Sequence, residues 1–301
     1  MTKITETDKL KAYATPVGER VQTPDLLTGK VLQGGTFDTN HVGHIRNSYR
    51  HHNHMFIKYP AQYPNPPAIL LGLNSLEIDR CANVRVRTSA EDIHEHIFGA
   101  HIRSWDNTRL YSAGCTWLAV PRGHPSFQFG TFHTEQDHIA WNVRHLTSRK
   151  IVFGRPYETP PKIVVWLNAL DLCRDHNERV MAFATDITTT GFTVHINSWD
   201  DTRLFGAGIS WFAYPEGFPG ICSGSLLPVG GTSGVVKFEK KFAKPPRLVL
   251  AGLNKLDSDR HGRCSFKIVT EGVSEMGMGI RVEGWGDTVL HSAGVGYLAI
   301  E

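Results

Sequence analysis

Hydrophobic residues along this chain alternate with polar residues or form short unbroken runs, and turn residues separate these segments. In the clearest example, residues 195–199 alternate, residues 200–202 read Asp-Asp-Thr, and residues 203–213 alternate again. This is the pattern of a β-hairpin with an Asx-type corner. Short segments rich in β-branched and aromatic residues predict further strands at 84–88, 180–185 and 266–270. No stretch of ten residues or more shows a helical period, so the pattern predicts an all-β protein.

The same pattern occurs three times. Each occurrence ends in a similar stretch, which reads SWDNTRLYSAGCTWLAVP at 104–121, SWDDTRLFGAGISWFAYP at 198–215 and GWGDTVLHSAGVGYLAI at 284–300. Each occurrence also contains two prolines followed by an apolar run that ends in an asparagine, at Asn74, Asn168 and Asn254. Each asparagine lies 31 residues before the tryptophan of its closing stretch. A spacing kept over this length predicts three related units.

The repeat of about 90 residues is too long for a solenoid unit and has the size of a small domain. We place the three copies at 31–121, 126–216 and 222–301, and we expect the polar residues 1–30 to form an N-terminal arm. About six strands in 85 residues predict a two-sheet sandwich. The expected fold is therefore all-β, with three tandem six-stranded antiparallel β-sandwich domains. A glycine inside each return strand predicts a bulge or a close backbone approach, at Gly114, Gly208 and Gly294.

The composition of the chain argues against several classes of binding partner. With 301 residues, of which 41% are hydrophobic, the chain can build three small cores, and its net charge of +3 does not favour nucleic acid. No stretch approaches 18 apolar residues, so we expect no membrane insertion. The start of the chain lacks an apolar signal region. The five cysteines occupy positions that do not recur between copies, which predicts free thiols. We therefore expect a cytoplasmic protein, released on damage or by non-classical secretion.

Catalytic and metal-binding patterns are weak. The chain has no Gly-x-Ser-x-Gly sequence, no recurring pair of carboxylates and no phosphate-binding glycine loop, so we expect no enzyme. Histidines are dense at 51–54 and at 94–96, with His101 nearby. A zinc site needs three or four converging ligands, but this cluster has no equivalent in the other copies and no supporting cysteine spacing. We therefore expect a polar loop there, with no metal and no cofactor.

The order of these motifs resembles the H-type lectin domain of snail agglutinins and of the discoidin C-terminal domain. The shared order is phenylalanine, Pro-Pro, apolar run, Leu-Asn, Arg-Val, Gly-Phe, Trp-x-Asp/Asn-Thr, Ala-Gly and an aromatic residue, and the second copy matches it best. The resemblance covers roughly 270 of the 301 residues. It implies a six-stranded antiparallel sandwich that assembles as a trimer and binds N-acetylgalactosamine or galactose, without metal, between neighbouring protomers.

The resemblance also implies a set of site residues. The cleft arginine falls on Arg85 and Arg179, whereas the third copy has Ser265 at the same offset. The tryptophan and the residues after it fall on Trp105, Asp106 and Asn107 in the first copy and on Trp199, Asp200 and Asp201 in the second. The third copy has Trp285 and Gly286 there. The aromatic position falls on Tyr111, Phe205 and, in the third copy, His291. The family's acidic loop corresponds to 38–47 and 133–142, where we assign no residue.

Physical chemistry supports such a site and also offers structural alternatives. A galactose-type sugar needs an aromatic face beside fixed charged partners, because hydrogen bonds to charged groups contribute about 1.5–3 kcal/mol each. The tryptophans could equally belong to the core, as we expect for Trp117 and Trp211. The residues before the threonines could simply hold the turn, and the arginines could pair with acids on the sheet face. The fold keeps a serine at the third arginine position, which favours a binding role for the other two arginines.

Short proline-bounded links at 121–125 and 215–219 hold neighbouring copies side by side. We therefore expect one chain to form an intramolecular pseudo-threefold trimer, as a monomer or as a homodimer of such trimers. Its expected partners are glycans with terminal N-acetylgalactosamine or galactose, bound multivalently. The alternative is a carbohydrate-binding or structural β-sandwich scaffold accessory to a partner enzyme or protein. The third copy, which lacks both the arginine and the corner carboxylate, should contribute least to binding.

Overall fold

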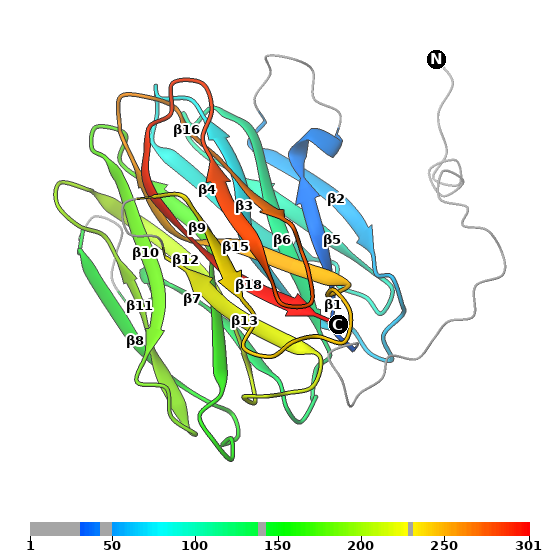
Figure 1. Cartoon of the computed structure of the whole chain (residues 1–301). Coiled ribbons are helices and arrows are strands. Elements are labelled where there is room, and N and C mark those ends of the chain that lie inside the picture. Colours follow the sequence, from blue (N-terminus) through cyan, green and yellow to red (C-terminus); the bar gives the residue numbers. More distant parts are fainter. Residues whose placement is uncertain (1–30, 43–49, 138–142, 228–230) are drawn as a thin grey trace, which may run out of the picture.

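The computed structural model describes residues 31–42, 50–137, 143–227 and 231–301, and the expected N-terminal arm lies outside these residues. Within them, the all-β prediction is confirmed, because the regular structure is strand apart from the short 3-10 segments η3 (Thr39–Val42) and η4 (Thr134–Gln136). Figure 1 shows these strands packed as layers. No helix in the described parts of the chain is long and apolar enough to cross a membrane.

Each copy contributes six strands. Copy 1 contains β1 (Gln33–Asp38), β2 (His52–Lys58), β3 (Ala68–Ile78), β4 (Val84–Glu91), β5 (Ile97–Arg103) and β6 (Leu110–Val120). Copy 2 contains β7 (Gln128–His133), β8 (Leu146–Val152), β9 (Lys162–Leu172), β10 (Glu178–Thr185), β11 (Gly191–Asn197) and β12 (Leu204–Tyr214). Copy 3 contains β13 (Ile221–Leu226), β14 (Ser233–Lys237), β15 (Leu248–Ser258), β16 (Cys264–Glu271), β17 (Gly277–Glu283) and β18 (Leu290–Ile300). The hairpin predicted around residues 200–202 is the β11–β12 connection.

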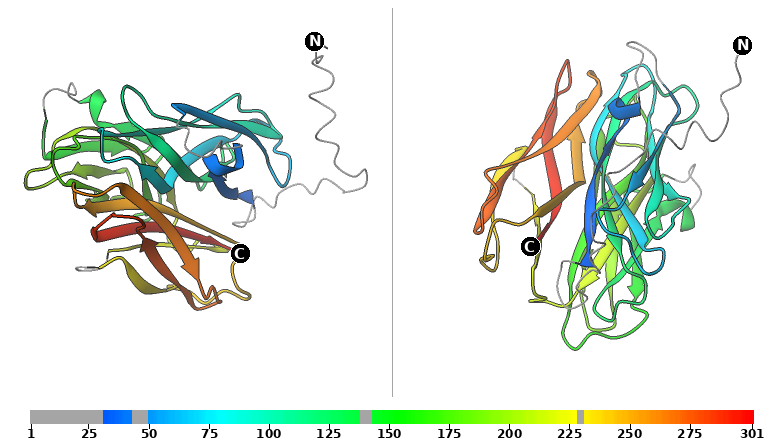
Figure 2. Two further views of the ribbon diagram at one scale, coloured as in Figure 1. Left: turned by 90° about the horizontal axis from the view of Figure 1, so that it is seen from above. Right: turned by 90° about the vertical axis from the view of Figure 1, so that its right-hand side faces the viewer.

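Each sheet contains strands from two different copies. The strand orders are β1-β6-β3-β16-β17-β14, β13-β18-β15-β10-β11-β8 and β2-β5-β4-β9-β12-β7. Each six-stranded sheet therefore joins three strands of one copy to three strands of another, and each copy shares one sheet with each of the other two. Seen from above, the blue, green and orange-red parts of the chain lie next to one another (Figure 2).

The three junctions between copies use equivalent strands in equivalent registers. In each junction the start of one strand pairs antiparallel with the end of a long strand from another copy: β4 with β9, β10 with β15, and β16 with β3. The second residue of each shorter strand faces a carboxylate residue across the junction, in the pairs Arg85↔Asp171, Arg179↔Asp257 and Ser265↔Glu77. Strand pairing therefore brings the predicted site arginines to the boundaries between copies.

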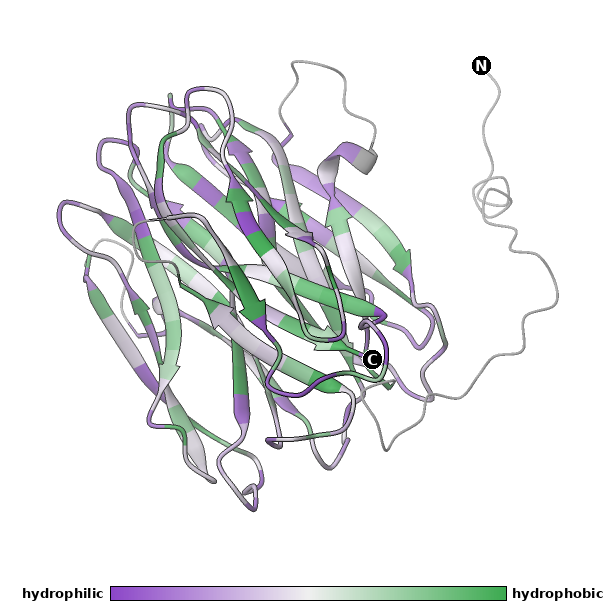
Figure 3. Ribbon diagram, viewed as in Figure 1, coloured by the Kyte–Doolittle hydropathy of each residue, from purple (hydrophilic) through white to green (hydrophobic). Residues whose placement is uncertain are grey.

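Residues from all three copies build a common inner core, in which Trp166 has the central place. This cluster includes Leu70 of copy 1 and Leu250 of copy 3 besides Trp166 itself, which is 1% exposed. The positions equivalent to Trp166 are Gly72 and Gly252, and a Cβ atom at either glycine would lie 2.5 or 2.6 Å from a Trp166 side-chain atom. One large side chain and two glycines thus fill a space that could not hold three tryptophans. Figure 3 shows hydrophobic segments along the strands of all three copies.

The repeated asparagine and glycine form a β-bulge in every copy. The register between the two long strands shifts at Asn74, so that Leu73 pairs with Cys115 and Ser75 pairs with Gly114. A Cβ atom at Gly114 would lie 2.6 Å from Oδ1 of Asn74, so the amide occupies the space above the glycine. The same short distance recurs in copies 2 and 3, at Gly208 with Asn168 and at Gly294 with Asn254. The predicted bulge is confirmed, and it explains why these two motifs repeat together.

Several smaller predictions can also be compared with the structure. Trp117 and Trp211 are buried in the core, as predicted. All five cysteines are unpaired. The expectation of a polar loop at 51–54 was wrong in part, because His52 and His54 lie on strand β2 with their side chains on its outer face, while the intervening Asn53 is buried.

Candidate functional site

The two predicted site arginines each lie between an acid of the neighbouring copy and a turn of their own copy. Nε of Arg85 is 3.4 Å from Oδ1 of Asp171 in copy 2, and Nε of Arg179 is 3.3 Å from Oδ1 of Asp257 in copy 3. The arginine side chains are 15% and 14% exposed. These contacts are ion pairs without aligned hydrogen bonds, since Nε of Arg85 and both carboxylate oxygens lack a hydrogen-bond partner.

The turn after the tryptophan supplies the other partners of each arginine. Nη1 of Arg85 donates to Oδ1 of Asn107 at 3.0 Å and lies 3.6 Å from Oδ2 of Asp106. In copy 2, Nη1 of Arg179 donates to Oδ1 of Asp201 at 2.6 Å and lies 3.8 Å from Oδ2 of Asp200. Asn107 and Asp201 therefore hold the guanidinium groups in place.

The pKa values of two carboxyl groups at these sites shift in opposite directions. The hydrogen bond from Arg179 lowers the pKa of Asp201. Burial raises the pKa of Asp171, and the neighbouring Arg85 opposes this shift. Arg85 thus favours the charged form of Asp171, which belongs to the other copy.

The backbone of this turn explains why the third copy has a glycine. Asp106 and Asp200 both have φ of 53°, in the left-handed region, and Gly286 has φ of 67°. Aspartate and asparagine tolerate this conformation better than most residues, and glycine adopts it without strain. The glycine in copy 3 therefore fits the turn geometry, and it removes only an exposed carboxylate.

Both site tryptophans are half-exposed, and each lies beneath a cation. The guanidinium carbon of Arg87 is 5.9 Å from the Trp105 ring centre, within copy 1. At the next junction the ammonium group of Lys255, from copy 3, is 5.7 Å from the Trp199 ring centre of copy 2. These distances are in the range of cation–π contacts. The partly exposed indoles leave aromatic surface at both junctions, in contrast to the buried Trp117 and Trp211.

The aromatic position six residues after the tryptophan differs between copies. The Tyr111 hydroxyl donates to Oδ2 of Asp79 at 2.7 Å, so it is fixed within copy 1. The Phe205 ring is half-buried and lies 5.9 Å from the Arg203 guanidinium carbon. Tyr111 lies on β6, which pairs with β3, and Phe205 lies on β12, which pairs with β9. Since β3 and β9 carry the junction acids, each aromatic residue belongs to the opposite side of a junction from the arginine.

The third junction has a cation that the sequence prediction missed. Ser265 is buried, and its Oγ lacks a hydrogen-bond partner. Two residues earlier, Nη1 of Arg263 lies 2.9 Å from Oε1 of Glu77, and the guanidinium carbon is 5.3 Å from the Tyr111 ring centre. Ser265 supplies no cation, as expected, but Arg263 brings one to this junction. Arg263 lies just before β16, so the strand pattern gave no signal for it.

A groove of about 610 Å³ lies between copies 1 and 2, beside the first junction. Nη2 of Arg87 lies 3.0 Å from Nε2 of His133 and 3.2 Å from Oε2 of Glu135, both from copy 2. Burial, with a further contribution from Arg87, lowers the pKa of His133 to about 4, so this imidazole is neutral at pH 7. Sequence reasoning left this segment unassigned, and residues 138–142 of the same loop lie outside the described residues.

A separate cluster in copy 1 has the side chains of a metal site. One ring nitrogen from each of His52, His54 and His101 lies within 4.8 Å of the others. His52 and His54 are exposed, whereas His101 is buried. Burial is the main reason why the pKa values of His52 and His101 are lowered. The other dense histidines, His94 and His96, stack on each other elsewhere, in the β4–β5 connection.

The H-type lectin domain family matches the chain at residues 55–120, 148–214 and 233–300. These matches cover more than half of the chain, which therefore belongs to the H-type lectin domain family and carries three tandem copies of the domain. The resemblance seen in the sequence is confirmed. Domains of this family bind carbohydrates and are not catalytic.

One further similarity is short. A protein of Fuscovulum blasticum described as "ATP synthase subunits region ORF 7" is 28% identical over 64 residues, which is 21% of this chain and 56% of that protein. The chain thus spans about half the length of that relative.

Proposed function

We propose that this protein is a multivalent lectin that binds terminal N-acetylgalactosamine or galactose at the junctions between its copies. The observation that carries the proposal is the repeated arrangement at two junctions: an arginine of one copy, a carboxylate of the next, and a half-exposed tryptophan. The exposed carboxylates of Asp106 and Asp200 would accept hydrogen bonds from sugar hydroxyls, and the indoles would pack against the apolar C–H face.

In this proposal the three copies of one chain take the place of three lectin protomers around a pseudo-threefold axis. Support comes from the three equivalent junctions and from the inner core that all three copies share. Shared sheets fix the distance between sites, so that weak individual sites can act together on one multivalent glycan. The third junction, with Arg263 in place of the usual arginine and Gly286 in the turn, would bind most weakly.

A glycan array with wild-type protein and the Arg85→Ala, Arg179→Ala and double variants tests the proposal. Loss of one charged hydrogen bond costs about 1.5–3 kcal/mol, so we expect a roughly 10- to 100-fold loss of affinity at each changed junction. The double variant should lose nearly all array binding. Arg281→Ala, which removes an arginine paired with Glu283 within copy 3, is the matched control and should bind as wild type does. Circular dichroism confirms that each variant is folded.

Three results would count against the proposal. Wild-type binding that persists in the double variant would place the sugar site elsewhere, and binding to sugars of another class would refute the galactose assignment. No binding to any glycan would favour the second candidate, a structural or accessory scaffold. The observation that favours this second candidate is that Arg85 and Arg179 already have carboxylate and amide partners within the chain.

We also propose that the protein works in a reducing compartment such as the cytoplasm. The support is that all five cysteines are unpaired. Fractionation of the source cells with an antibody against the chain tests this, and recovery from the oxidising secretory lumen would refute it.

A further inference from the structure

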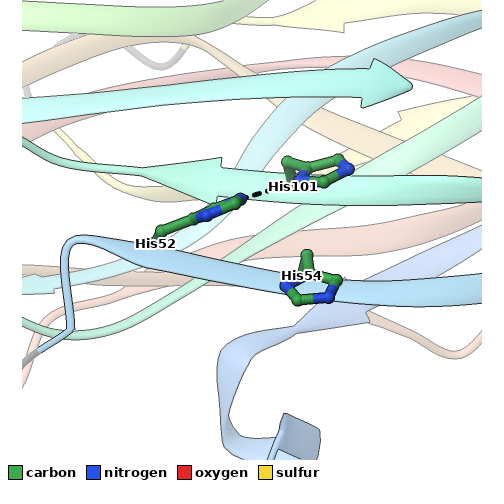
Figure 4. Close-up of side chains that lie close together, drawn as sticks. All are labelled: His52, His54 and His101. Atoms are coloured by element: carbon green, nitrogen blue, oxygen red, sulfur yellow. Dashed lines mark hydrogen bonds between the residues drawn. The ribbon is translucent and has the colours of Figure 1, made fainter. Parts of the chain in front are cut away.

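The histidine cluster of copy 1 is built by the pairing of two adjacent strands. His52 and His54 are alternate residues of the edge strand β2, and His54 lies directly opposite His101 of β5. Alternate residues of a strand point to the same face, so all three imidazoles meet on the outer face of one sheet. The ring centres are 5.1 to 5.4 Å apart. Figure 4 shows His52 and His54 on one strand and His101 on its neighbour.

Different groups face the two ring nitrogens of the buried histidine. Nε2 of His52 is 2.8 Å from Nδ1 of His101, whereas Nε2 of His101 lies 3.6 Å from Oε2 of Glu91 on the other side of the ring. With His52 as the donor, Nδ1 of His101 accepts, and the Nε2–H of His101 faces Glu91 beyond hydrogen-bond distance. A carboxylate that faces the non-ligating nitrogen of a histidine is a recurring arrangement around protein-bound metals.

The nearest cation, Arg103, contacts both this histidine and the same carboxylate. Nη2 of Arg103 is 3.4 Å from Nδ1 of His101, but both of its terminal nitrogens bind Glu91, at 2.5 and 2.9 Å. The Arg103–Glu91 pair is neutral as a unit, so it adds little repulsion to an incoming divalent cation. Glu91 thus orients His101 and also neutralises the arginine beside it.

The cluster is specific to copy 1. At the positions of His52 and His54, copy 2 has Leu146 and Ser148, and its remaining histidine, His195, stacks on Phe183 at 4.7 Å. Gly99 leaves room for the His101 imidazole, because a Cβ atom at this position would lie 3.0 Å from Nε2 of His101. Since the sandwich forms in copy 2 without these side chains, the domain fold does not require the cluster.

We propose that His52, His54 and His101 form a binding site for a divalent transition metal with a preference for imidazole ligands, such as Zn²⁺, Ni²⁺ or Cu²⁺. The ligand atoms are Nε2 of His52, Nδ1 of His101 and a ring nitrogen of His54. The exposed side of the cluster leaves room for water or another ligand at the remaining coordination position. Glu91 is a positioning residue, since it faces the nitrogen of His101 that does not point into the site.

Metal binding requires only small movements. Two nitrogens bound at about 2.0–2.1 Å in tetrahedral geometry lie roughly 3.3 Å apart. The His52–His101 pair must therefore open from 2.8 Å, and His54 must approach from within 4.8 Å. The proton between His52 and His101 moves to Nδ1 of His52, which frees Nε2 of His52 for the metal. Rotation of the exposed His52 and His54 side chains supplies these shifts.

Competition titration of Zn²⁺ with a chromogenic chelator tests the site on the full chain without a histidine tag. We expect one tight equivalent in wild type. Because loss of an orienting partner alone costs 10- to 100-fold in metal affinity, we expect loss of a ligand in His54→Asn or His52→Asn to weaken binding by at least about 10-fold. Glu91→Gln should weaken it less than either. Both exposed histidines can be replaced without disturbing the core.

The control variant His94→Asn/His96→Asn removes two histidines outside the cluster and should keep the tight equivalent. A crystal soaked in Zn²⁺ should show its strongest anomalous peak between His52, His54 and His101. Wild-type binding no tighter than that of His54→Asn would overturn the proposal. So would a tight equivalent lost in the control, or a strongest anomalous peak at other residues. Sugar binding is not involved, so the outcome is independent of the lectin proposal.

Discussion

Trp166 provides a direct test of the core that the three copies share. The side chain is 1% exposed and packs against Gly72 and Gly252, and its Nε1 donates to the Gly296 carbonyl oxygen at 2.9 Å. Replacement of a buried tryptophan by alanine costs about 3–5 kcal/mol, because the cavity between the copies cannot collapse fully. We therefore expect Trp166→Ala to lower the free energy of unfolding by this amount, as measured by urea denaturation.

A double-mutant cycle shows whether copies 2 and 3 truly share this space. Gly252→Val alone places its Cβ 2.6 Å from Cδ1 of Trp166, so overpacking should destabilise the protein by about 1–3 kcal/mol or more. Alanine at position 166 lacks this atom, so in Trp166→Ala/Gly252→Val the valine fills part of the cavity. The double variant should then be more stable than the sum of the single effects predicts, by about 1–3 kcal/mol. Single effects that add within about 0.5 kcal/mol would refute the shared core.

Three further predictions concern single positions. Burial raises the pKa of Glu178 to about 8, so the folded state takes up a proton that the unfolded state, with a pKa near 4.5, has lost. The contribution of this group to stability should therefore be largest below about pH 5 and fall by about 1.4 kcal/mol per pH unit towards pH 8. Urea denaturation of wild type and of Glu178→Gln at several pH values isolates this slope. Parallel plots of unfolding free energy against pH for the two proteins would contradict the prediction. Gly208→Ala should destabilise copy 2 by about 1–3 kcal/mol, since its Cβ would lie 2.5 Å from Oδ1 of Asn168, and an unchanged midpoint would show that the bulge relaxes freely. Asp106→Gly should leave thermal stability unchanged or slightly higher, because the turn has φ of 53°, yet weaken sugar binding in the glycan array; unchanged binding would remove this carboxylate from the site.

The strand pattern predicted most of the fold, because period-two alternation and turn residues are local properties of the sequence. The bulge could also be anticipated, since Asn168 and Gly208 recur at fixed offsets in every copy. The sharing of sheets between copies could not be read from the pattern. An edge strand offers the same unpaired backbone groups to any partner, so the hydrophobic period does not say which copy β4 or β10 will join.

The sequence predicted the arginines of the site but not the residues that contact them across the junctions. The family resemblance pointed to Arg85 and Arg179, whereas the opposing Asp171 and Asp257 became visible only with the junction register. Arg263 was missed because it lies two residues before the expected position, just ahead of the first residue of β16.

The histidine cluster shows the same limit. His54 and His101 lie far apart in the sequence, and only the β2–β5 register places them opposite each other. The density of histidines in one segment of the sequence therefore did not predict which histidines come together. His94 and His96 stay outside the cluster, whereas His101 belongs to it.

The central claim is that sugars bind where one copy meets the next. A crystal structure of the chain soaked with N-acetylgalactosamine tests it most directly. The account predicts sugar density against Trp105 and Asp106 at the first junction and against Trp199 and Asp200 at the second, with weaker occupancy at the third. Sugar bound within a single copy, away from all three junctions, would contradict it.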